Sequence, residues 1–430
     1  MRVAVVGTGI SGNVAAYLLK ASSHDVVVYE KENRVGGHAH TISVTSGSRN
    51  FAVDTGFIVF NELNYPNFAG LLRKLGVATA ETDMGFSVSE QFGRFEWSAR
   101  GDTCFKTWNG LFAQRSNLLS PAFYRMLLDI RRFNREAASD LEYGRLGDLA
   151  LGDYLSRHGF SRQFLQHYLL PMGAAIWSGT TKEIFDFPAS SFIAFLKNHL
   201  LLRSRRQVWR TVVGGSQNYV DRMTASFRDN IRLGTAVKAL KRTFENVIVV
   251  DGNGRQETFD QVVVATHPDQ ALAILDDASD DERAILGAIR YRINNVHVHC
   301  DDRLMPKRRA AWAPWNFTRL DVNGTSHESV TYWMNALQDI DQSFPVFVTL
   351  NPPVEPAPET TFARLVYEHP QFDRHAIAAQ RRMESIQGVA RTWYCGAWMG
   401  YGFHEDGATA GMSVAHKLAT ESTRSVGLLN

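Results

Sequence analysis

Three glycines near the N-terminus have the spacing that lets a backbone hold a diphosphate. Gly7, Gly9 and Gly12 follow the apolar run 2–6 and open a helical pattern over 13–20. Gly7 permits a sharp turn off a strand, Gly9 leaves room for a phosphate to approach the main chain, and Gly12 lets the helix pack closely on the sheet. The helix start adds free N–H groups and the positive end of the helix dipole. We therefore expect this segment to bind the pyrophosphate of a dinucleotide.

A single acid extends the glycine pattern. Glu30 ends a second apolar run, 25–29, and stands eighteen residues after Gly12. A carboxylate at this position accepts hydrogen bonds from ribose hydroxyls, and its charge disfavours the 2′-phosphate of NADP. Because strand, glycine turn, helix, second strand and acid occur in order, the sequence favours a dinucleotide site over a strand–turn–helix that holds no ligand.

The residues after Glu30 narrow the choice of dinucleotide. Arg34 and the stretch 36–38, which reads Gly-Gly-His, follow the acid, and Thr41 lies three residues further on. This stretch resembles the E-x-x-x-R-x-G-G sequence of the flavin amine oxidase superfamily, a continuation that NAD-only domains lack. The resemblance implies FAD, with the acid on the adenosine ribose and with the arginine and the glycine pair along the pyrophosphate and the flavin.

Later segments resemble the same superfamily in the same order: 230–237, 260–268, 393–396 and 406–415. The last one is implied to be a helix whose positive end faces the flavin. Cys395 raises the question of covalent attachment, but its place at a strand end favours a buried structural residue and non-covalent FAD. The cofactor-binding residues that the resemblance implies are Gly7, Gly9, Ile10, Ser11, Gly12, Glu30, Lys31, Arg34, Gly36, Gly37, His38, Thr55, Gly56, Phe57, Ile58, Val237, Ala265, Thr266, Gly396, Gly411 and Met412.

The predicted fold class is α/β, with a Rossmann-like FAD-binding domain of the amine-oxidase type. A mixed α+β substrate domain with a helical subdomain is expected to interrupt it. The FAD-binding domain is expected to comprise 1–60, 205–270 and 388–430. The substrate-binding domain is expected to comprise 61–204, which is largely helical in pattern, and 271–387, which carries strand patterns. Active sites in such pairs lie between the domains.

Composition limits the functional classes. The 430 residues carry a formal net charge of +2, which is too balanced to argue for nucleic-acid binding. Cys104, Cys300 and Cys395 form no C-x-x-C motif and a strand pattern begins at residue 2, so a reducing cytoplasm is expected. No apolar run reaches the roughly 18 residues of a membrane span. The prediction is a cytoplasmic protein, with association at the inner face of the membrane left open.

A closer resemblance points to a reaction. The stretches that carry it are 34–41, 53–61, 170–178, 299–306 and 400–407. Together they are similar to a bacterial subgroup of predicted FAD-binding oxidoreductases, typically encoded beside cyclopropane-fatty-acid-synthase-like methyltransferases. The subgroup resembles the dehydrogenase of methylated furan fatty acid synthesis. This implies desaturation of a methylated fatty acyl chain of a membrane phospholipid, with hydride transfer to flavin N5, and a methyltransferase partner. Cys300 departs from the subgroup, where a threonine is expected.

Desaturation also releases a proton, so the site needs a base. His404 and Glu405 directly precede the predicted flavin-facing helix and are the catalytic candidates, although a polar pair that satisfies loop backbone fits the pattern equally well. His299 and Tyr332 are further proton acceptors. His297 and His299 share one strand face, but no third ligand stands at metal spacing, so no metal is predicted.

Two other functions stay open. An amine oxidase predicts an aromatic cage and usually a lysine beside the flavin, and the strand patterns offer no obvious lysine. The other alternative is a non-catalytic flavoprotein that stabilises a lipid methyltransferase.

Two basic segments predict contact with anionic lipid, with a solvated helix end as the alternative for the first. The first follows the apolar helix pattern 192–196, and the second, 307–309, stands beside Trp312 and Trp315. The basic residues of the first segment are Lys197, Arg203, Arg205, Arg206 and Arg210.

Overall fold

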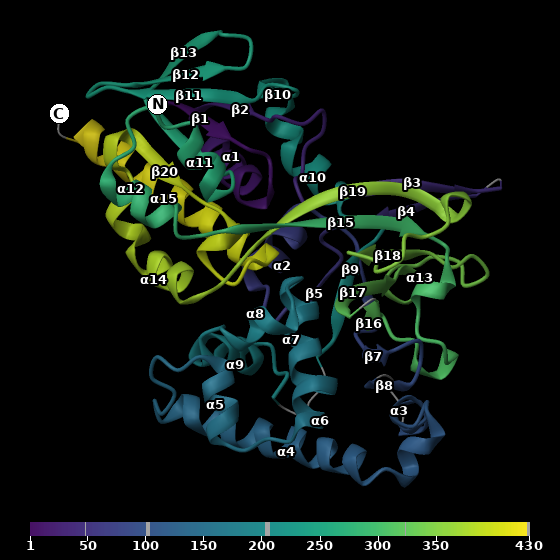
Figure 1. Cartoon of the computed structure of the whole chain (residues 1–430). Coiled ribbons are helices and arrows are strands. Elements are labelled where there is room, and N and C mark those ends of the chain that lie inside the picture. The colour runs from purple at the N-terminus through teal and green to yellow at the C-terminus, as the bar shows by residue number, and fades with distance from the viewer. Residues whose placement is uncertain (48, 100–103, 203–206, 323, 428–430) are drawn as a thin grey trace.

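The chain forms a parallel sheet with its helices at one end, a second sheet in the middle and a group of helices at the other end (Figure 1). The computed structural model describes residues 1–47, 49–99, 104–202, 207–322 and 324–427. The predicted basic residues Arg203, Arg205 and Arg206 lie outside the described residues.

The first sheet contains five parallel strands in the order β10, β2, β1, β14 and β20. Their bounds are Ile231–Arg232, Asp25–Tyr29, Arg2–Val6, Gln261–Val264 and Thr392–Tyr394. Side chains of β1 alternate between the two faces. Val5 packs with helices α1 (Ile10–Ala21) and α15 (His404–Gly427), whereas Val6 packs on the opposite face. Because both faces are buried, the strands read as continuous apolar runs.

Three antiparallel strands and three helices cover the second face. They are β11 (Val237–Arg242), β12 (Val247–Asp251), β13 (Gln256–Phe259), α11 (Pro268–Ala273), α12 (Asp280–Leu286) and α14 (Arg374–Arg382). These elements share one apolar core with Val6 and Val264 of the parallel sheet. The cofactor domain therefore continues past the boundaries expected at 270 and 388, because a sheet buried on both faces needs cover from both.

The second sheet has seven strands in the order β19, β15, β18, β17, β16, β7 and β8. Their bounds are Thr361–Pro370, Tyr291–His299, Phe347–Leu350, Thr325–Trp333, Trp315–Val322, Phe86–Glu90 and Phe95–Ala99. The β16–β7 pair is parallel, and the other described pairs are antiparallel. The hairpin of β3 (Thr41–Ser46) and β4 (Arg49–Asp54) shares an apolar cluster with this sheet through Val44 and Val53.

A small sheet joins the two domains. Its strands are β5 (Val59–Phe60), β9 (Trp209–Val212) and β6 (Thr79–Thr82), and its neighbours are α2 (Pro66–Lys74) and α10 (Gln217–Thr224). Phe60, Phe68 and Tyr219 form its core together with Ile10 of α1. This core therefore joins α2 and α10 to helix α1, which begins at the glycine turn.

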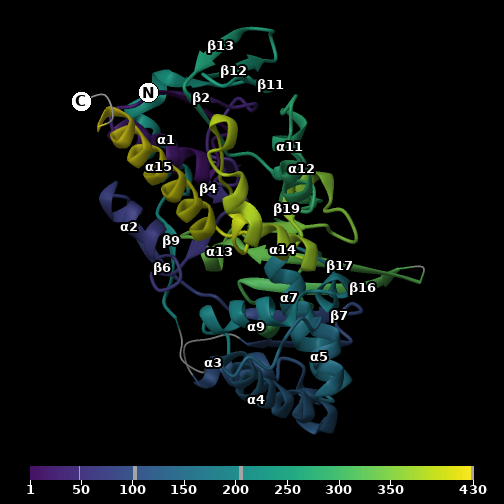
Figure 2. The ribbon, with the colours of Figure 1, turned by 90° about the vertical axis from the view of Figure 1, so that its left-hand side faces the viewer.

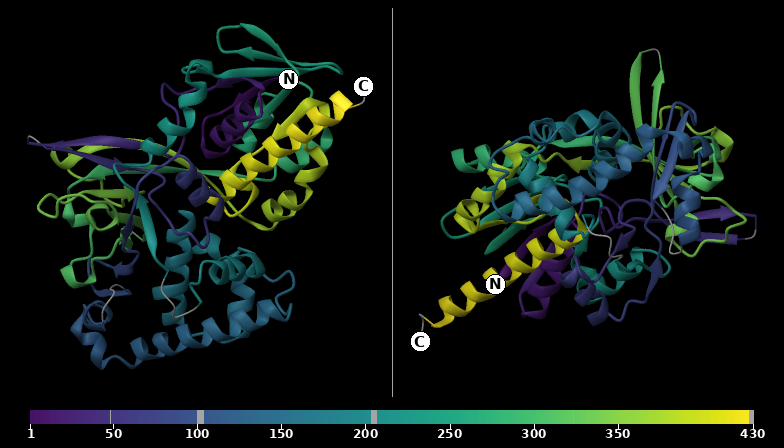
Figure 3. Two further views of the ribbon diagram at one scale, coloured as in Figure 1. Left: turned by 180° about the vertical axis from the view of Figure 1, so that it is seen from behind. Right: turned by 90° about the horizontal axis from the view of Figure 1, so that it is seen from below.

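Seven further helices lie below the second sheet in Figure 2. They are α3 (Cys104–Leu111), α4 (Pro121–Glu142), α5 (Leu151–Arg157), α6 (Arg162–Phe164), α7 (Leu170–Trp177), α8 (Thr181–Phe185) and α9 (Ala189–Asn198). Their core includes Val88 and Trp97 of the second sheet. Figure 3 shows from behind that α4 runs along the outer edge of this group.

A π-helical turn, Leu165–Leu169, lies between α6 and α7. Such turns release carbonyl groups from the regular helical ladder. Here Trp97 Nε1 donates to the carbonyl of His167 at 2.9 Å, and Arg319 Nη2 donates to that of Gln166 at 3.3 Å. The second sheet therefore supplies the donors that this irregular turn requires.

Candidate active site

The glycine turn forms a backbone cradle at the carboxyl end of β1. Gly7 has φ +101°, and a Cβ on Gly12 would lie 2.0 Å from the carbonyl oxygen of Gly7. A Cβ on Gly9, in contrast, would meet no protein atom within 4 Å. The protein's own packing therefore requires glycine at 7 and 12, whereas Gly9 borders open space, as a residue approached by a phosphate should.

The carboxylate of Glu30 lies beside this turn and is almost fully buried. One of its oxygens accepts from the backbone N–H and the hydroxyl of Thr8, and the other accepts from the N–H of Glu32 at 2.9 Å. The N–H of Thr235 donates to the Glu30 carbonyl at 2.7 Å, which brings the segment before Val237 to the same place. Because a carboxylate has about four lone-pair sites and three are used, one remains for a ribose hydroxyl.

The Arg-x-Gly-Gly-His stretch folds back onto the glycine turn. The N–H of Gly36 donates to the Thr8 carbonyl at 3.1 Å, and Arg34 Nη1 donates to the Gly37 carbonyl at 2.8 Å. A Cβ on Gly37 would lie 2.9 Å from the Cα of Gly9. The two motifs that the sequence separates by more than twenty residues thus form one surface.

The predicted segment Thr55–Ile58 joins this surface through His38. The N–H of Phe57 donates to the His38 carbonyl at 2.8 Å, and a Cβ on Gly56 would lie 2.3 Å from the same oxygen. The hydroxyl of Thr55 contacts the Tyr367 hydroxyl at 2.5 Å. Since Tyr367 belongs to β19, this is where the cofactor domain meets the second sheet.

Helix α15 begins beside the start of α1. A Cβ on Gly407 would lie 2.6 Å from Cγ2 of Ile10, and one on Gly411 would lie 2.3 Å from the Ser11 carbonyl oxygen. The positive ends of two helices therefore lie near the same turn, which favours negative charge there.

The ends of β14 and β20 complete the surface. Trp398 Nε1 donates to the Thr266 carbonyl at 3.1 Å, and the carbonyl of Ala265 packs against Gly7. Gly396, between β20 and Trp398, has φ 176° and carries the chain toward α15. Of the predicted cofactor residues, Lys31 has an exposed side chain and Met412 packs on the α2 core.

His404 lies between two aromatic residues. Its ring stacks on that of Phe57 with centroids 3.7 Å apart, and its Nε2 lies 2.8 Å from the Tyr219 hydroxyl. Burial lowers the pKa of His404 well below its usual value, so the imidazole is neutral at physiological pH. His404 is therefore a neutral hydrogen-bonding group next to a segment that is predicted to bind the flavin.

Glu405 has a different partner. Its two carboxylate oxygens accept from the backbone N–H groups of Asn67 at 3.0 Å and Phe68 at 2.9 Å. These groups open α2, where a carboxylate satisfies unpaired N–H groups and the helix dipole. The geometry matches the alternative that the sequence left open, a polar side chain that satisfies backbone, and a catalytic role for Glu405 stays a prediction.

Sequence reasoning named His38 but missed the other imidazoles that gather with it opposite the glycine pair. The ring of His38 lies 5.0 Å from that of Tyr367 and 5.3 Å from that of His369, while His267 stacks on Tyr291 at 4.0 Å. Burial lowers the pKa of His38 and His267 to about 4 and that of His369 to about 3. Nε2 of His38 is buried without a partner among the described residues, so a ligand atom or a water is needed to satisfy it.

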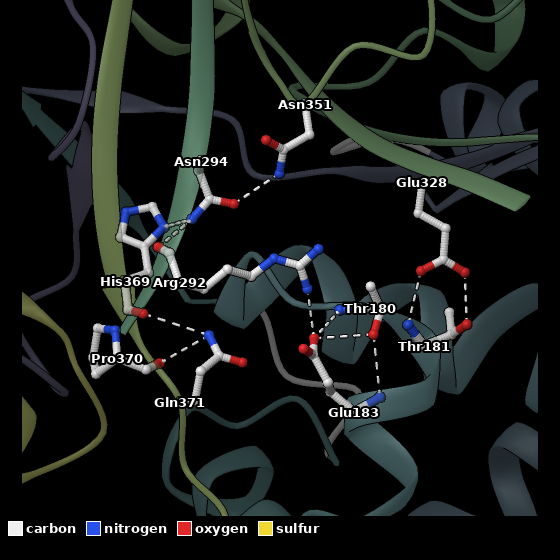
Figure 4. Close-up of polar contacts among 10 residues, drawn as sticks. All are labelled: Thr180, Thr181, Glu183, Arg292, Asn294, Glu328, Asn351, His369, Pro370 and Gln371. Carbon is white, nitrogen blue, oxygen red and sulfur yellow. Dashed lines mark hydrogen bonds and ion pairs between the residues drawn. The ribbon is translucent and has the colours of Figure 1, made fainter. Parts of the chain in front are cut away.

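Asn294 connects this cluster to the rest of the second sheet (Figure 4). Its Nδ2 lies 3.0 Å from Nδ1 of His369, and its Oδ1 accepts from Asn351 at 2.7 Å. Asn294 is fully buried on β15. None of the seven described strands of this sheet carries a lysine. The sequence signal for this part of the site was weak because its members come from β15, β19 and the loop after β14.

The further proton acceptors lie elsewhere. His299 is fully buried, its Nε2 lies 2.7 Å from the Thr349 hydroxyl and its Nδ1 accepts from the N–H of Asp301. Tyr332 is enclosed, and burial raises its pKa to about 12. Within the described ranges, no three His, Cys, Asp or Glu side chains are grouped closely enough to hold a metal ion. Cys395 is fully buried, and burial raises the pKa of its thiol to about 12.

Burial and internal pairing occupy side chains of the two basic segments that were predicted to contact lipid. Phe192, Ile193 and Phe195 of α9 lie in the helical core with at most 2% exposed, so they are not available for insertion into a bilayer. In the second segment Arg308 pairs with Glu96 at 2.9 Å, and Arg309 stacks over Trp312 at 3.6 Å. In the part of the chain that the structure describes, no helix combines the length and apolar character needed to cross a bilayer.

A sheet buried on both faces, a glycine cradle, a ribose-directed acid and two helix N-termini define a dinucleotide-dependent oxidoreductase with two domains. A family model, flavin containing amine oxidoreductase, matches residues 10–343. The chain belongs to this family, and FAD is its cofactor. The open side of Gly9, the Glu30 carboxylate and the unpartnered Nε2 of His38 fit that molecule.

Sequence relatives are distant. The chain is 25% identical over 276 residues to probable polyamine oxidase 4 of Arabidopsis thaliana, covering 62% of this chain and 50% of that protein. It is 24% identical over 342 residues to tryptophan 2-monooxygenase of Pseudomonas savastanoi, covering 70% and 59%. The chain thus spans half to three fifths of the length of these curated relatives.

Solved structures confirm the predicted α/β fold class. Putrescine oxidase bound to putrescine superposes with a TM-score of 0.70 at 14% identity, covering 98% of this chain and 99% of that one. A conjugated-linoleic-acid (CLA)-producing fatty acid isomerase from P. acnes superposes with a TM-score of 0.65 at 14% identity, covering 97% and 98%.

Proposed function

We propose that this protein is an FAD-dependent dehydrogenase that introduces a double bond into a methylated fatty acyl chain of a membrane phospholipid, as in furan fatty acid synthesis. The family supplies the cofactor and the reaction class. The finer assignment depends on the chemistry of the groups that face the cofactor cradle.

The observation that carries the proposal is that the imidazoles opposite the glycine pair are uncharged; the carboxylate beside them, that of Glu368, lies 3.0 Å from Nδ1 of His267. His38, His369 and His404 are held neutral by burial, and Phe57 and Tyr367 provide aromatic surface. Neutral imidazoles and aromatic rings suit reacting carbons that carry no charge, because burying a charge without a partner is costly. No lysine stands on the described strands of the facing sheet, in contrast to what an amine oxidase usually offers.

The chemistry balances with groups that the chain provides. Bound FAD supplies a two-electron acceptor for the hydride equivalent that leaves one carbon. The neighbouring carbon releases a proton, and the carbon–carbon double bond forms between the two. Neutral imidazoles at His404 and His38 can accept this proton, because each has a ring nitrogen with a lone pair.

The relatives support both this proposal and a second candidate. The fatty acid isomerase indicates that the fold accommodates an acyl chain in at least one protein. The polyamine oxidase and putrescine oxidase relatives favour an amine as the alternative substrate. Association with a neighbouring methyltransferase, which would produce the methylated chain, is part of the proposal.

Anaerobic mixing tests the function. The FAD-loaded protein is combined with phospholipid that carries a methylated acyl chain, with the unmethylated phospholipid as the matched control, and with putrescine in a third arm. We expect the oxidised flavin absorbance to fall only with the methylated lipid, and mass spectrometry to find a product with two hydrogens fewer. Bleaching by putrescine alone would replace the proposal with the amine oxidase, and no bleaching in any arm would favour the non-catalytic flavoprotein.

A further inference from the structure

The outer end of the helical group carries an apolar surface that none of the described residues covers. Trp108 of α3 is 62% exposed, and Leu119, in the 3₁₀ helix η1 (Arg115–Leu119), is 89% exposed. Leu118, Tyr124 and Leu128 are 41%, 43% and 60% exposed. Large exposed apolar side chains gathered in one place mark an interaction site. These five residues are called the apolar tip below.

Contacts within the protein show that the apolar tip is continuous. The ring of Trp108 lies 5.1 Å from that of Phe112, and Phe112 lies 6.4 Å from the ring of Tyr124. The Tyr124 hydroxyl donates to the Leu118 carbonyl at 3.1 Å. Leu128 stands four residues after Tyr124, one turn further along α4, on the same helical face. The tip therefore forms one patch across α3, η1 and the first half of α4.

The charge next to the tip is positive. Between Thr107 and Arg135 the sequence contains five arginines and a single acid, Asp129. Asp129 is 2% exposed and pairs with Arg125 and Arg132. Arg131 and Arg135 are exposed, and they follow Leu128 at helical spacing. The exposed face of α4 is thus apolar at its start and basic further along, where Arg135 lies 3.5 Å from Glu136, a carboxylate that is 30% exposed.

A cavity opens beside the tip. It has a volume of about 380 Å³ and is lined by both polar and apolar side chains. Its lining includes Ser116, Asn117 and Ser120 as well as Phe95, Phe123 and Met126. A mixed lining at an apolar and basic surface suits an amphiphile better than a folded protein partner.

We propose that α3, η1 and α4 form the face with which this protein docks on an anionic lipid bilayer. Leu118 and Leu119 enter the boundary between head groups and acyl chains, and Arg131 and Arg135 contact lipid phosphates. Docking would bring the protein to its acyl substrate, and this purpose rests on the proposed function. The binding of the surface to a bilayer does not depend on the proposed function. The surface differs from both basic segments that the sequence singled out.

Vesicle flotation of the FAD-loaded protein tests the apolar tip. Vesicles of phosphatidylcholine with phosphatidylglycerol are compared with pure phosphatidylcholine, and we expect binding to the anionic vesicles. The double variant Leu118→Glu/Leu119→Glu should bind at least about tenfold more weakly, since burial of each apolar side chain contributes about 1.5 kcal/mol or more. Phe244→Glu is the matched control, because Phe244 is 95% exposed in the turn between β11 and β12, at the other end of the molecule (Figure 1).

A second pair of variants tests the arginines. Arg131→Gln/Arg135→Gln should weaken binding by about fivefold per arginine and reduce its salt dependence, as expected for about 1 kcal/mol per basic residue near an anionic membrane. Arg374→Gln/Arg381→Gln on α14 removes two exposed arginines elsewhere and should leave binding unchanged.

The outcomes separate docking from catalysis. Equal and negligible flotation with both vesicle types would overturn the proposal, as would unchanged flotation of the Leu118→Glu/Leu119→Glu variant. A shift from dimer to monomer on gel filtration of that variant would instead assign the tip to contact between two copies of the chain. Flotation by a protein whose flavin is not bleached by methylated phospholipid would leave docking in place and reject the proposed function. Bleaching by detergent-dispersed lipid should be unaffected in the tip variant.

Discussion

The two surfaces that face each other at the site are built in different ways. In the cradle of Gly7, Gly12 and Gly37, the closest contacts are between backbone atoms, and an added Cβ would come within 2.0 to 2.9 Å of its neighbours. On the second sheet the contacts are between side chains such as His369 and Asn294, which meet at 3.0 Å. The first surface has no room for a larger residue at these glycines. The second tolerates substitution of its side chains if the polar groups stay paired.

This contrast assigns the two surfaces different roles. Backbone geometry that leaves no room for variation suits a cofactor that does not change. Side chains that can be exchanged one at a time suit the choice of substrate, which is where members of one fold differ. Substitutions in the cradle should therefore have large effects that are the same with every substrate, and substitutions on the second sheet should have smaller effects.

The largest effect is expected from Gly12→Ala. The new Cβ would lie 2.0 Å from the Gly7 carbonyl oxygen, so α1 must move away from the turn, at a cost of about 3 kcal/mol or more. Gly9→Ala is the paired test, because its Cβ meets no protein atom and its φ of −62° suits alanine. We expect thermal unfolding of the apoprotein to be lowered only by Gly12→Ala, and flavin content to fall in both. A Gly9→Ala protein with full flavin content would contradict the cradle.

Acidic pH should produce the next largest loss of stability, and the groups responsible lie mainly on the side-chain surface. The pKa values of His38, His267, His369 and His404 are lowered by burial, so the folded state holds these groups neutral. An unfolded histidine takes a proton below about pH 6.5, so stability is fully present above that pH and is lost as the pH falls toward 4, by up to about 1.4 kcal/mol per group and pH unit.

Two buried acids act in the opposite sense. Burial raises the pKa of Asp54 and Asp406 to about 6, so in the same range the folded state takes up protons that the unfolded state does not. Because the histidines with a lowered pKa outnumber these two acids, a net loss of stability is expected. Chemical unfolding between pH 7 and 4 measures it. His369→Gln should flatten the profile, and His416→Gln, at an exposed position, should not. A profile of wild type that is flat from pH 7 to 4 would reject this interpretation.

Local motifs were predictable because their partners are close in sequence. Glu30 finds Thr8 twenty-two residues away, and the strand, turn and helix between them follow from apolar periodicity and glycine spacing. The parallel strands and the main helices of the 104–198 group follow from the same signals. Domain boundaries were less predictable, because α12 and α14 cover the cofactor sheet from segments that resemble the substrate domain in composition.

The features that could not be predicted from the sequence depend on contacts between residues far apart in the chain. Glu405 stands beside His404 in the sequence, yet its partners are N–H groups 337 and 338 residues away, at the start of α2. The apolar pattern of α9 is compatible with a membrane face or a core face, and only packing against Trp177 and its neighbours decides for the core. Nothing in the local sequence around His369 indicates that its ring lies near that of His38.

A moderate effect is expected from Glu405→Gln, which tests the capping role against the catalytic one. Glutamine keeps one acceptor but loses the charge and the second acceptor for the α2 N–H groups, so we expect a loss of about 1 kcal/mol in stability. Turnover should stay within a few fold of wild type. The measurement pairs thermal unfolding with kcat, and Glu245→Gln, an exposed glutamate, serves as the control. A hundredfold fall in kcat with an unchanged unfolding temperature would restore Glu405 as a base.

The smallest effect is expected where the second sheet holds the helical group (Figure 4). Arg292 of β15 pairs with Glu183 of α8 at 2.7 Å, but their side chains are 32% and 46% exposed, so solvent weakens the pair. Glu183 also completes the capping box of α8 with Thr180, and it keeps this role when the arginine is removed. Arg292→Gln should therefore lower the free energy of unfolding by no more than about 1 kcal/mol, and less at high salt. A double-mutant cycle with Glu183→Gln in urea isolates the pair from the cap. A coupling energy of several kcal/mol would show that the side-chain surface is as intolerant as the glycine cradle, and the contrast between the two would fail.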